Sequence, residues 1–194
     1  MSEFGLYFQL GMEHILDTRG YDHILFVIAL CAIYVISDWK KVLILITAFT
    51  IGHSITLALA TLRVIRFNSD LIEFLIPLTI FLTTISNLFK KENGFRTRKI
   101  QTNYLLAVIF GLIHGLGFSN FLRSILGKDN SIITQLLAFN IGLEIGQIII
   151  VAIFLGATLI LVDIFGVKRR DWKLIISSAV GGIALILLLE SKYW

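Results

Sequence analysis

Long uninterrupted runs of apolar residues dominate the chain, and short polar or charged stretches separate them. A helix needs about 20 mostly apolar residues to cross about 30 Å of hydrocarbon. Continuous runs favour helices over β-barrel strands, whose residues alternate between apolar and polar. The pattern therefore predicts an all-α polytopic membrane helix bundle that forms a single transmembrane domain over residues 1–194. Six spans are predicted, at about residues 21–36, 42–62, 71–89, 104–122, 132–164 and 172–189.

The first 20 residues do not form a clear span, because acidic and basic residues interrupt their apolar run. The segment has no basic n-region and no small-residue cleavage site, so we do not expect a secretory signal peptide. We interpret it as an amphipathic or re-entrant helix at one face of the membrane, with an ordinary interfacial anchor as the alternative.

Composition supports a membrane protein and excludes other classes. Hydrophobic residues make up 57% of the chain and charged residues 15%, against about 45–50% and about 25% in ordinary globular domains. Cys31 is the single cysteine, which excludes a secreted disulfide scaffold. The apolar excess also excludes disorder.

The distribution of basic residues predicts the orientation, since cytoplasmic loops carry the excess of Lys and Arg. Eleven of the 17 basic residues follow the first, third and fifth predicted spans. We therefore expect an integral protein of the bacterial inner (plasma) membrane, with both termini on the periplasmic side. The same rule explains the basic loops, so we predict no nucleic-acid partner.

Ionisable residues inside membrane spans are rare and mark functional sites. His53 lies near the middle of the second span, and Thr50 and Ser54 lie on the same helical face. His114 lies in the fourth span, between Gly111 and Gly115. The alternative for both histidines is a structural side chain bonded between packed helices.

The fifth span carries Asn140, Glu144 and Gln147 on one face, which predicts a polar lining. Asp22 and His23 are adjacent at the outer end of the first span. An aspartate beside a histidine can orient the imidazole or act as a second ligand, although Asp is also a common helix cap.

Helical rise at 1.5 Å per residue places these groups near the bilayer midplane or somewhat outside it. The four histidines of the chain, His14, His23, His53 and His114, can therefore belong to one site that opens outward. Imidazoles with one or two carboxylates suit Zn²⁺, Ni²⁺, Co²⁺ or Cu²⁺. Paired histidines could also ligate haem, but the polar neighbours favour a hydrated ion.

Four ordered stretches, at residues 14–26, 49–57, 110–118 and 139–147, resemble the motifs of HupE/UreJ proteins. The resemblance extends over nearly the whole chain. It implies an accessory protein of nickel enzymes that acts as a nickel or cobalt permease. Ile15 follows the first histidine where family members often carry proline, which places the chain on a side branch.

The leading hypothesis is a permease for a divalent transition metal ion, Ni²⁺, Co²⁺ or Zn²⁺. The expected metal ligands are His14, Asp22, His23, His53, His114 and Glu144, with Thr50, Ser54, Asn140 and Gln147 hydrogen-bonded around them.

Two alternatives stay open. One is a zinc-dependent intramembrane hydrolase in which Ser54 or Glu144 assists catalysis. The other is a metal sensor or assembly factor. The lipid bilayer and the metal ion are the expected partners, and Gly-xxx-Gly pairs leave a homo-oligomer open.

Overall fold

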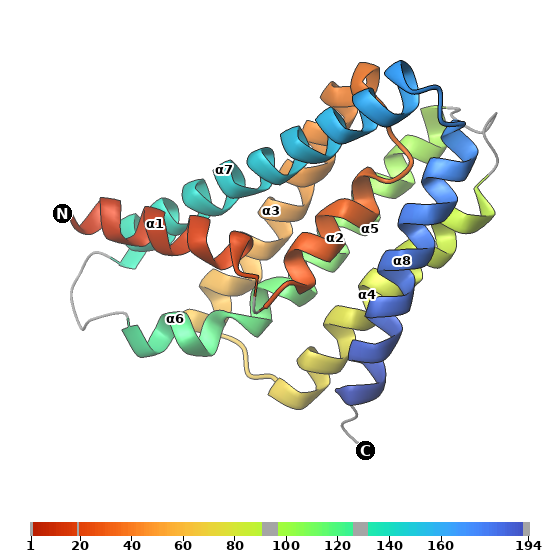
Figure 1. Cartoon of the computed structure of the whole chain (residues 1–194). Helices are drawn as coiled ribbons and strands as arrows, with labels where there is room; N and C mark the ends of the chain where they lie inside the picture. The colour runs from red at the N-terminus through yellow and green to blue at the C-terminus, as the bar shows by residue number, and fades with distance from the viewer. Residues whose placement is uncertain (1, 19, 91–96, 126–131, 192–194) are drawn as a thin grey trace.

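A computed structural model describes residues 2–18, 20–90, 97–125 and 132–191, without the side chains of residues 97–102. Within these ranges the chain forms helices joined by short turns, and no strand occurs (Figure 1). The all-α prediction is therefore confirmed. The elements are α1 (Glu3–Leu16), α2 (Asp22–Cys31), the 3-10 turn η1 (Ile36–Asp38), α3 (Trp39–Thr61), α4 (Ser69–Phe89), α5 (Thr97–Gly117), α6 (Ser119–Ile125), α7 (Ile132–Thr158), the π-helical η2 (Leu159–Ile164) and α8 (Arg169–Glu190).

Four helical segments of the described chain are long and apolar enough to cross a membrane, and α5 with α6 gives a fifth if the bent pair counts as one span. The four are residues 36–61, 69–89, 132–164 and 169–190, which match the second, third, fifth and sixth predicted spans within a few residues. The expected total of six is therefore only approximate.

The predicted first span is wrong in extent, because α2 ends at Cys31 after ten residues. At 1.5 Å per residue α2 is about 15 Å long, half of the hydrocarbon thickness. The residues that follow Cys31 are also apolar, so hydropathy does not mark the helix end. A tertiary contact does: the Asn87 side-chain amide of α4 donates to the Ala29 carbonyl at 2.7 Å, which satisfies a carbonyl in the last turn of α2.

The predicted fourth span bends, because α5 ends at Gly117 and α6 leaves it at 46°. Ser119 supports the bend, since its hydroxyl donates to the Leu116 carbonyl at 2.8 Å. Its backbone begins a new short helix. The break lies inside a continuous apolar run, so periodicity could not locate it.

The N-terminal helix α1 packs along α7 and runs parallel to its first half (Figure 1). A Cβ atom built on Gly11 would lie 2.0 Å from the Phe139 carbonyl oxygen, and one on Gly142 would lie 1.9 Å from the Phe8 carbonyl oxygen. The two backbones are therefore in contact. α1 ends at Leu16 and α2 begins at Asp22, so the two helices follow each other along the bundle as separate elements.

Helices α3 and α5 make the second close contact of the bundle. A Cβ on Gly52 would lie 2.2 Å from the Val108 carbonyl oxygen, and one on Gly111 would lie 2.1 Å from the Phe49 carbonyl oxygen. Small residues let membrane helices approach in this way, since lipid offers no hydrophobic driving force between them. The pair fixes the height of His53 and His114 relative to each other.

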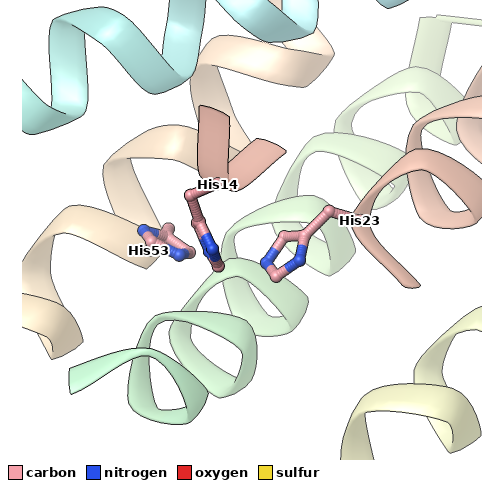
Figure 2. A group of neighbouring side chains, drawn as sticks. All are labelled: His14, His23 and His53. Atoms are coloured by element: carbon pink, nitrogen blue, oxygen red, sulfur yellow. The ribbon is translucent and has the colours of Figure 1, made fainter. Parts of the chain in front are cut away.

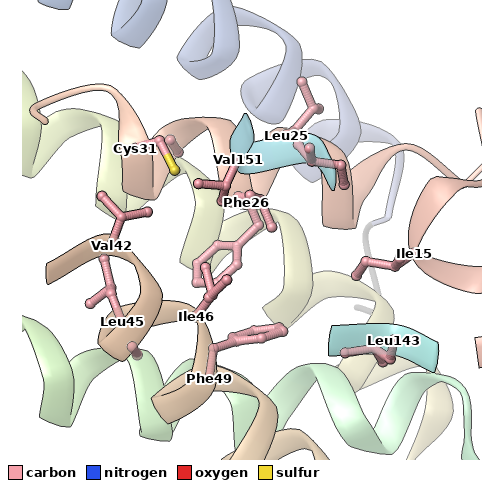
Figure 3. Close-up of a cluster of buried hydrophobic side chains, with 14 of the residues drawn as sticks. Ile15, Leu25, Phe26, Cys31, Val42, Leu45, Ile46, Phe49, Leu143 and Val151 are labelled. Carbon is pink, nitrogen blue, oxygen red and sulfur yellow. The ribbon is translucent and has the colours of Figure 1, made fainter. Parts of the chain in front are cut away.

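Apolar side chains form one core beside these contacts, and Figure 3 shows the part of it that α1, α2, α3 and α7 supply. Phe26 and Phe49 lie at its centre, with ring centroids 4.8 Å apart. Ile15 and Leu143 are fully buried at the side where α1 meets α7. This core holds α1 against α7, and α2 against α4 and α7.

Helix α3 ends in a Schellman motif. The Val64 amide donates to the Leu59 carbonyl at 2.9 Å, and the Arg63 amide donates to the Ala60 carbonyl at 3.1 Å. Arg63 holds the left-handed position of the motif, with φ of 60°. Glycine usually occupies this position, and a side chain there costs about 1 kcal/mol or more.

We expect Gly111→Ala to destabilise the protein by about 1–3 kcal/mol, the usual cost of overpacking, because its new methyl group would meet the α3 backbone. Thermal unfolding in detergent measures the effect. Gly182→Ala in α8 is the matched control, since a Cβ there meets nothing within 4 Å. Equal unfolding midpoints for the two variants would show that α3 and α5 are not in backbone contact.

Candidate metal centre

Three histidines from three helices meet inside the bundle. His14 lies in the last turn of α1, His23 in the first turn of α2 and His53 in the second half of α3. One ring nitrogen from each lies within 4.8 Å of the others, and the three rings converge on one volume (Figure 2).

The break between α1 and α2 brings the first two histidines together. His14 and His23 are nine positions apart, yet their ring centroids are 4.6 Å apart. Phe118, at the break between α5 and α6, covers His14 with its ring centroid 3.8 Å away. Two helix interruptions therefore meet at the cluster.

His53 completes the cluster from α3. Its ring centroid lies 6.2 Å from that of His14 and 6.0 Å from that of His23. A Cβ on Gly115 of α5 would lie 2.2 Å from the His53 carbonyl oxygen. The α3–α5 contact therefore fixes the backbone of His53 directly.

Four ring nitrogens of the cluster are buried and lack a hydrogen-bond partner within the described chain. Within the described chain, no hydrogen-bond partner reaches Nε2 of His14, Nε2 of His23 or either ring nitrogen of His53. A buried polar atom without a partner costs about 1–3 kcal/mol. A ligand that accepts several imidazoles would remove this cost.

The spacing of the three nitrogens is compatible with a metal site after small side-chain rotations. A tetrahedral metal with nitrogens at about 2.0–2.1 Å holds those nitrogens about 3.4 Å from one another. The observed limit of 4.8 Å is within the reach of small side-chain rotations. Three imidazoles leave one coordination position open for water, a fourth side chain or a passing ligand.

Asp22 holds one ring in place. Its Oδ1 lies 3.1 Å from His23 Nδ1 and also accepts a 2.9 Å hydrogen bond from the His23 backbone amide. A carboxylate on Nδ1 leaves Nε2 directed at the cluster and makes the imidazole a stronger ligand. Asp22 is thus placed to orient His23, and its part in metal binding stays a prediction.

His114 lies beside the three-histidine cluster. Its ring centroid is 5.2 Å from that of His23, and its Nε2 lies 3.0 Å from the Thr79 hydroxyl of α4. Its Nδ1 has no partner among the described residues. The structure therefore holds His114 next to the cluster through Thr79, with one nitrogen free.

Glu144 lies in a neighbouring polar layer between α3 and α7. Its carboxylate accepts a 2.7 Å hydrogen bond from Thr47, and it does not join the group of three histidines. Gln147 accepts from Thr50 at 2.8 Å in the same layer. These two bonds tie α7 to the face of α3 that carries His53.

The other two expected residues bond to their own helices. Ser54 donates to the Thr50 carbonyl at 2.7 Å. The Asn140 amide donates to the Leu136 carbonyl at 2.8 Å, while its Oδ1 has no partner within the described chain.

A family model described as HupE / UreJ protein matches residues 1–191 of the chain. The chain belongs to the HupE/UreJ family. The family is linked to the handling of nickel and cobalt. No match to a curated protein or to a solved structure was found.

In this family member a wide cavity of about 860 Å³ leads to the histidine cluster. His14, Asp22 and His23 form its inner wall, and Phe118 and Phe121 line it from the α5–α6 bend. Three further carboxylates line it as well: Glu13, Asp17 and Glu73.

Sequence reasoning missed these three carboxylates and the two residues that support the cluster, Thr79 and Phe118. Glu13 and Asp17 flank His14 in the sequence, and that spacing was the one available indication. Glu73 and Thr79 belong to α4, and Phe118 lies at the α5–α6 break, so only the packing of helices brings them to the site.

We expect Asp22→Asn to weaken binding of Ni²⁺ by about 10–100-fold, the usual effect of removing a carboxylate that orients a ligating histidine. Calorimetric titration of the purified protein measures the affinity. Asp70→Asn is the control, because Asp70 also lies in the first turn of a helix but outside the cavity. Equal affinities in the two variants would remove Asp22 from the site.

Proposed function

We propose that this protein is a permease for Ni²⁺ or Co²⁺, with Zn²⁺ as an alternative cargo, and that His14, His23 and His53 bind the ion on its way. One observation carries the proposal: three imidazoles from three helices converge, two of them buried and that of His14 half-buried, and each has a buried ring nitrogen without a partner within the described chain. Membership of the HupE/UreJ family supports nickel or cobalt over other imidazole-binding metals.

The choice of donors supports a borderline transition metal. Imidazole suits nickel, cobalt, copper and zinc, whereas Mg²⁺ and Ca²⁺ prefer oxygen ligands. The lone thiol, Cys31, is buried in the apolar core and gives no soft ligand for Cu⁺.

The cavity supports entry from the side where α1 ends and α2 begins. Four carboxylates line it, from Glu13, Asp17, Asp22 and Glu73, and no basic residue of the described chain does. A cleft lined by one sign of charge raises the local concentration of the opposite ion. A divalent cation would therefore be drawn to the two imidazoles of the inner wall.

The broken helices support movement of the ion past the site. Transporters often place their substrate site at discontinuous helices near the membrane midplane. Here the α1–α2 break and the α5–α6 bend meet at His14. The next polar side chains on α3 toward Trp39 are Thr50 and Thr47, bonded to Gln147 and Glu144.

We place this polar layer, with His114 and Asn140, along the path of the ion beyond the cluster. His114 and Glu144 would act there as further ligands, and Ser54 would hold the α3 backbone. The basic residues that flank the start of α3 and the start of α8 orient that end to the cytoplasm by the positive-inside rule. The cavity then opens to the periplasm of a bacterial cell, and both ends of the chain lie on that side.

The hydrolase alternative gains no support from its expected catalytic side chains. Ser54 donates to a carbonyl of its own helix, and Glu144 accepts from Thr47. A sensor would bind metal without moving it, and the transport assay below separates it from a permease.

We expect His53→Ala to lose bound nickel and to abolish Ni²⁺ uptake into proteoliposomes, because the substitution removes one of the three imidazole ligands. The readouts are elemental analysis of the purified protein and the initial uptake rate of radioactive nickel. Ser177→Ala is the control, since Ser177 is buried in α8, which gives no side chain to the cluster.

Each outcome of this experiment decides one point. Wild-type protein that binds no transition metal above background refutes the site. Binding that depends on His53 without uptake refutes the permease and favours a sensor or a hydrolase.

We expect Glu73→Gln to raise the KM for Ni²⁺ uptake several-fold at low ionic strength and much less at high ionic strength, since salt screens the field of exposed charges. Glu190→Gln is the matched control, an exposed glutamate at the same end of the bundle that does not line the cavity. A KM shift that ignores salt, or that both variants share, would contradict electrostatic capture by this cavity.

A further inference from the structure

A second cavity, of opposite charge, lies at the end of the bundle where α3 ends and α4 begins. Its volume is about 500 Å³. Arg63, Arg66 and Asn120 line it with two apolar residues of the α3–α4 turn, Ile65 and Phe67. Arg123 of α6 completes the lining.

The three arginines have no acidic partner among the described residues. Within the described ranges, none of them forms an ion pair, and no carboxylate lines the cavity. Arg123 donates to the Asn120 side-chain oxygen at 2.6 Å, which turns its guanidinium along α6. All the described basic residues at this end of the bundle thus line one cavity.

The backbone of Arg63 gives independent evidence that its side chain is useful. Arg63 holds the left-handed position of the Schellman motif at the end of α3, with φ of 60°. Glycine fits that position without strain. Glycine would serve the fold better here. The presence of a strained residue with a long charged side chain instead indicates a role for that side chain.

Helix α6 separates this cavity from the acidic one. Phe121 lines the acidic cavity, whereas Asn120 and Arg123 line the basic one. An anion held by the arginines would therefore bind apart from the metal path. The inference does not depend on the proposed transport of metal.

We propose that the three arginines bind a phosphate group, and that its source is the headgroup of an anionic membrane lipid. Arginine presents several N–H donors in a fork that matches phosphate oxygens. Ile65 and Phe67 supply an apolar wall for the glycerol portion of the lipid. Leu62 and Val64 are exposed on the same turn, where acyl chains would contact them.

The position in the bundle favours a lipid over a soluble anion. The cavity lies at the ends of α3 and α4, two helices long and apolar enough to span a membrane. The headgroup layer lies at that depth. Clustered arginines at this depth recognise anionic headgroups, with about 1 kcal/mol for each basic residue.

The test measures binding of phosphatidylglycerol and phosphatidylcholine to the full-length protein by native mass spectrometry. We expect Arg63→Gly to lower the affinity for phosphatidylglycerol about fivefold. The same substitution should leave the unfolding midpoint of lipid-free protein unchanged or raised, because glycine relieves the strain. Arg66→Gln, which leaves the Schellman position intact, should lower the affinity by a similar factor.

Arg169→Gln is the matched control, an exposed arginine at the start of α8 and at the other end of the bundle. It should keep the wild-type preference for phosphatidylglycerol within twofold. A parallel titration with glycerol phosphate distinguishes the source of the phosphate. Weak binding of glycerol phosphate supports the lipid, and binding as tight as that of the lipid assigns the cavity to a soluble phosphate ester.

Two results would overturn the proposal. One is an affinity for phosphatidylglycerol and for glycerol phosphate that neither Arg63→Gly nor Arg66→Gln changes. The other is equal retention of phosphatidylcholine and phosphatidylglycerol by the wild type without binding of glycerol phosphate, which would show that the arginines only extend their side chains into the interface.

Discussion

The architecture depends on backbone contact between helices at glycine positions. In a membrane the lipid is as apolar as the helices, so packing must come from close approach. Gly52 and Gly111 join α3 to α5, and Gly11 and Gly142 join α1 to α7. These contacts leave no room for a methyl group, and they decide which faces of the helices turn inward. Helices α1, α3 and α5, which carry three of the four histidines, are thereby fixed in depth and rotation.

The histidine cluster follows from that packing. α1 ends against α7 at Leu16 and α2 begins six residues later at Asp22, so the imidazoles of His14 and His23, from two different helices, share one volume with His53. Buried nitrogens without protein partners are costly, and Asp22 adds a carboxylate that orients His23. Without a ligand, the arrangement costs folding free energy. A bound metal ion would remove that cost. A permease would use the same breaks that build the site, since interrupted helices can rearrange at fixed points.

Helix α6 separates a cavity lined by carboxylates from a cavity lined by arginines. The acidic cavity faces the histidines, and the arginine cavity faces the ends of α3 and α4. The seven residues of α6 lie between them. A cation and an anionic headgroup could therefore bind side by side without neutralising each other's sites, and the anchoring of one wall to lipid would steady the mouth that admits the ion.

The sequence by itself determined the all-helical class, four of the long apolar helices and the residue types of the site. Hydropathy, and the presence of a histidine within an apolar run, are local properties that the sequence contains. The sequence also carried the family motifs. The end of α2 coincides with a tertiary contact from Asn87, and the end of α5 with a local bond from Ser119 to the Leu116 carbonyl. Both ends lie within runs that stay apolar, so hydropathy does not locate them. Only the tertiary structure separated the three converging histidines from His114 and Glu144, because membership of a ligand set depends on helix rotation and on which nitrogen finds a partner. A one-dimensional pattern contains neither quantity.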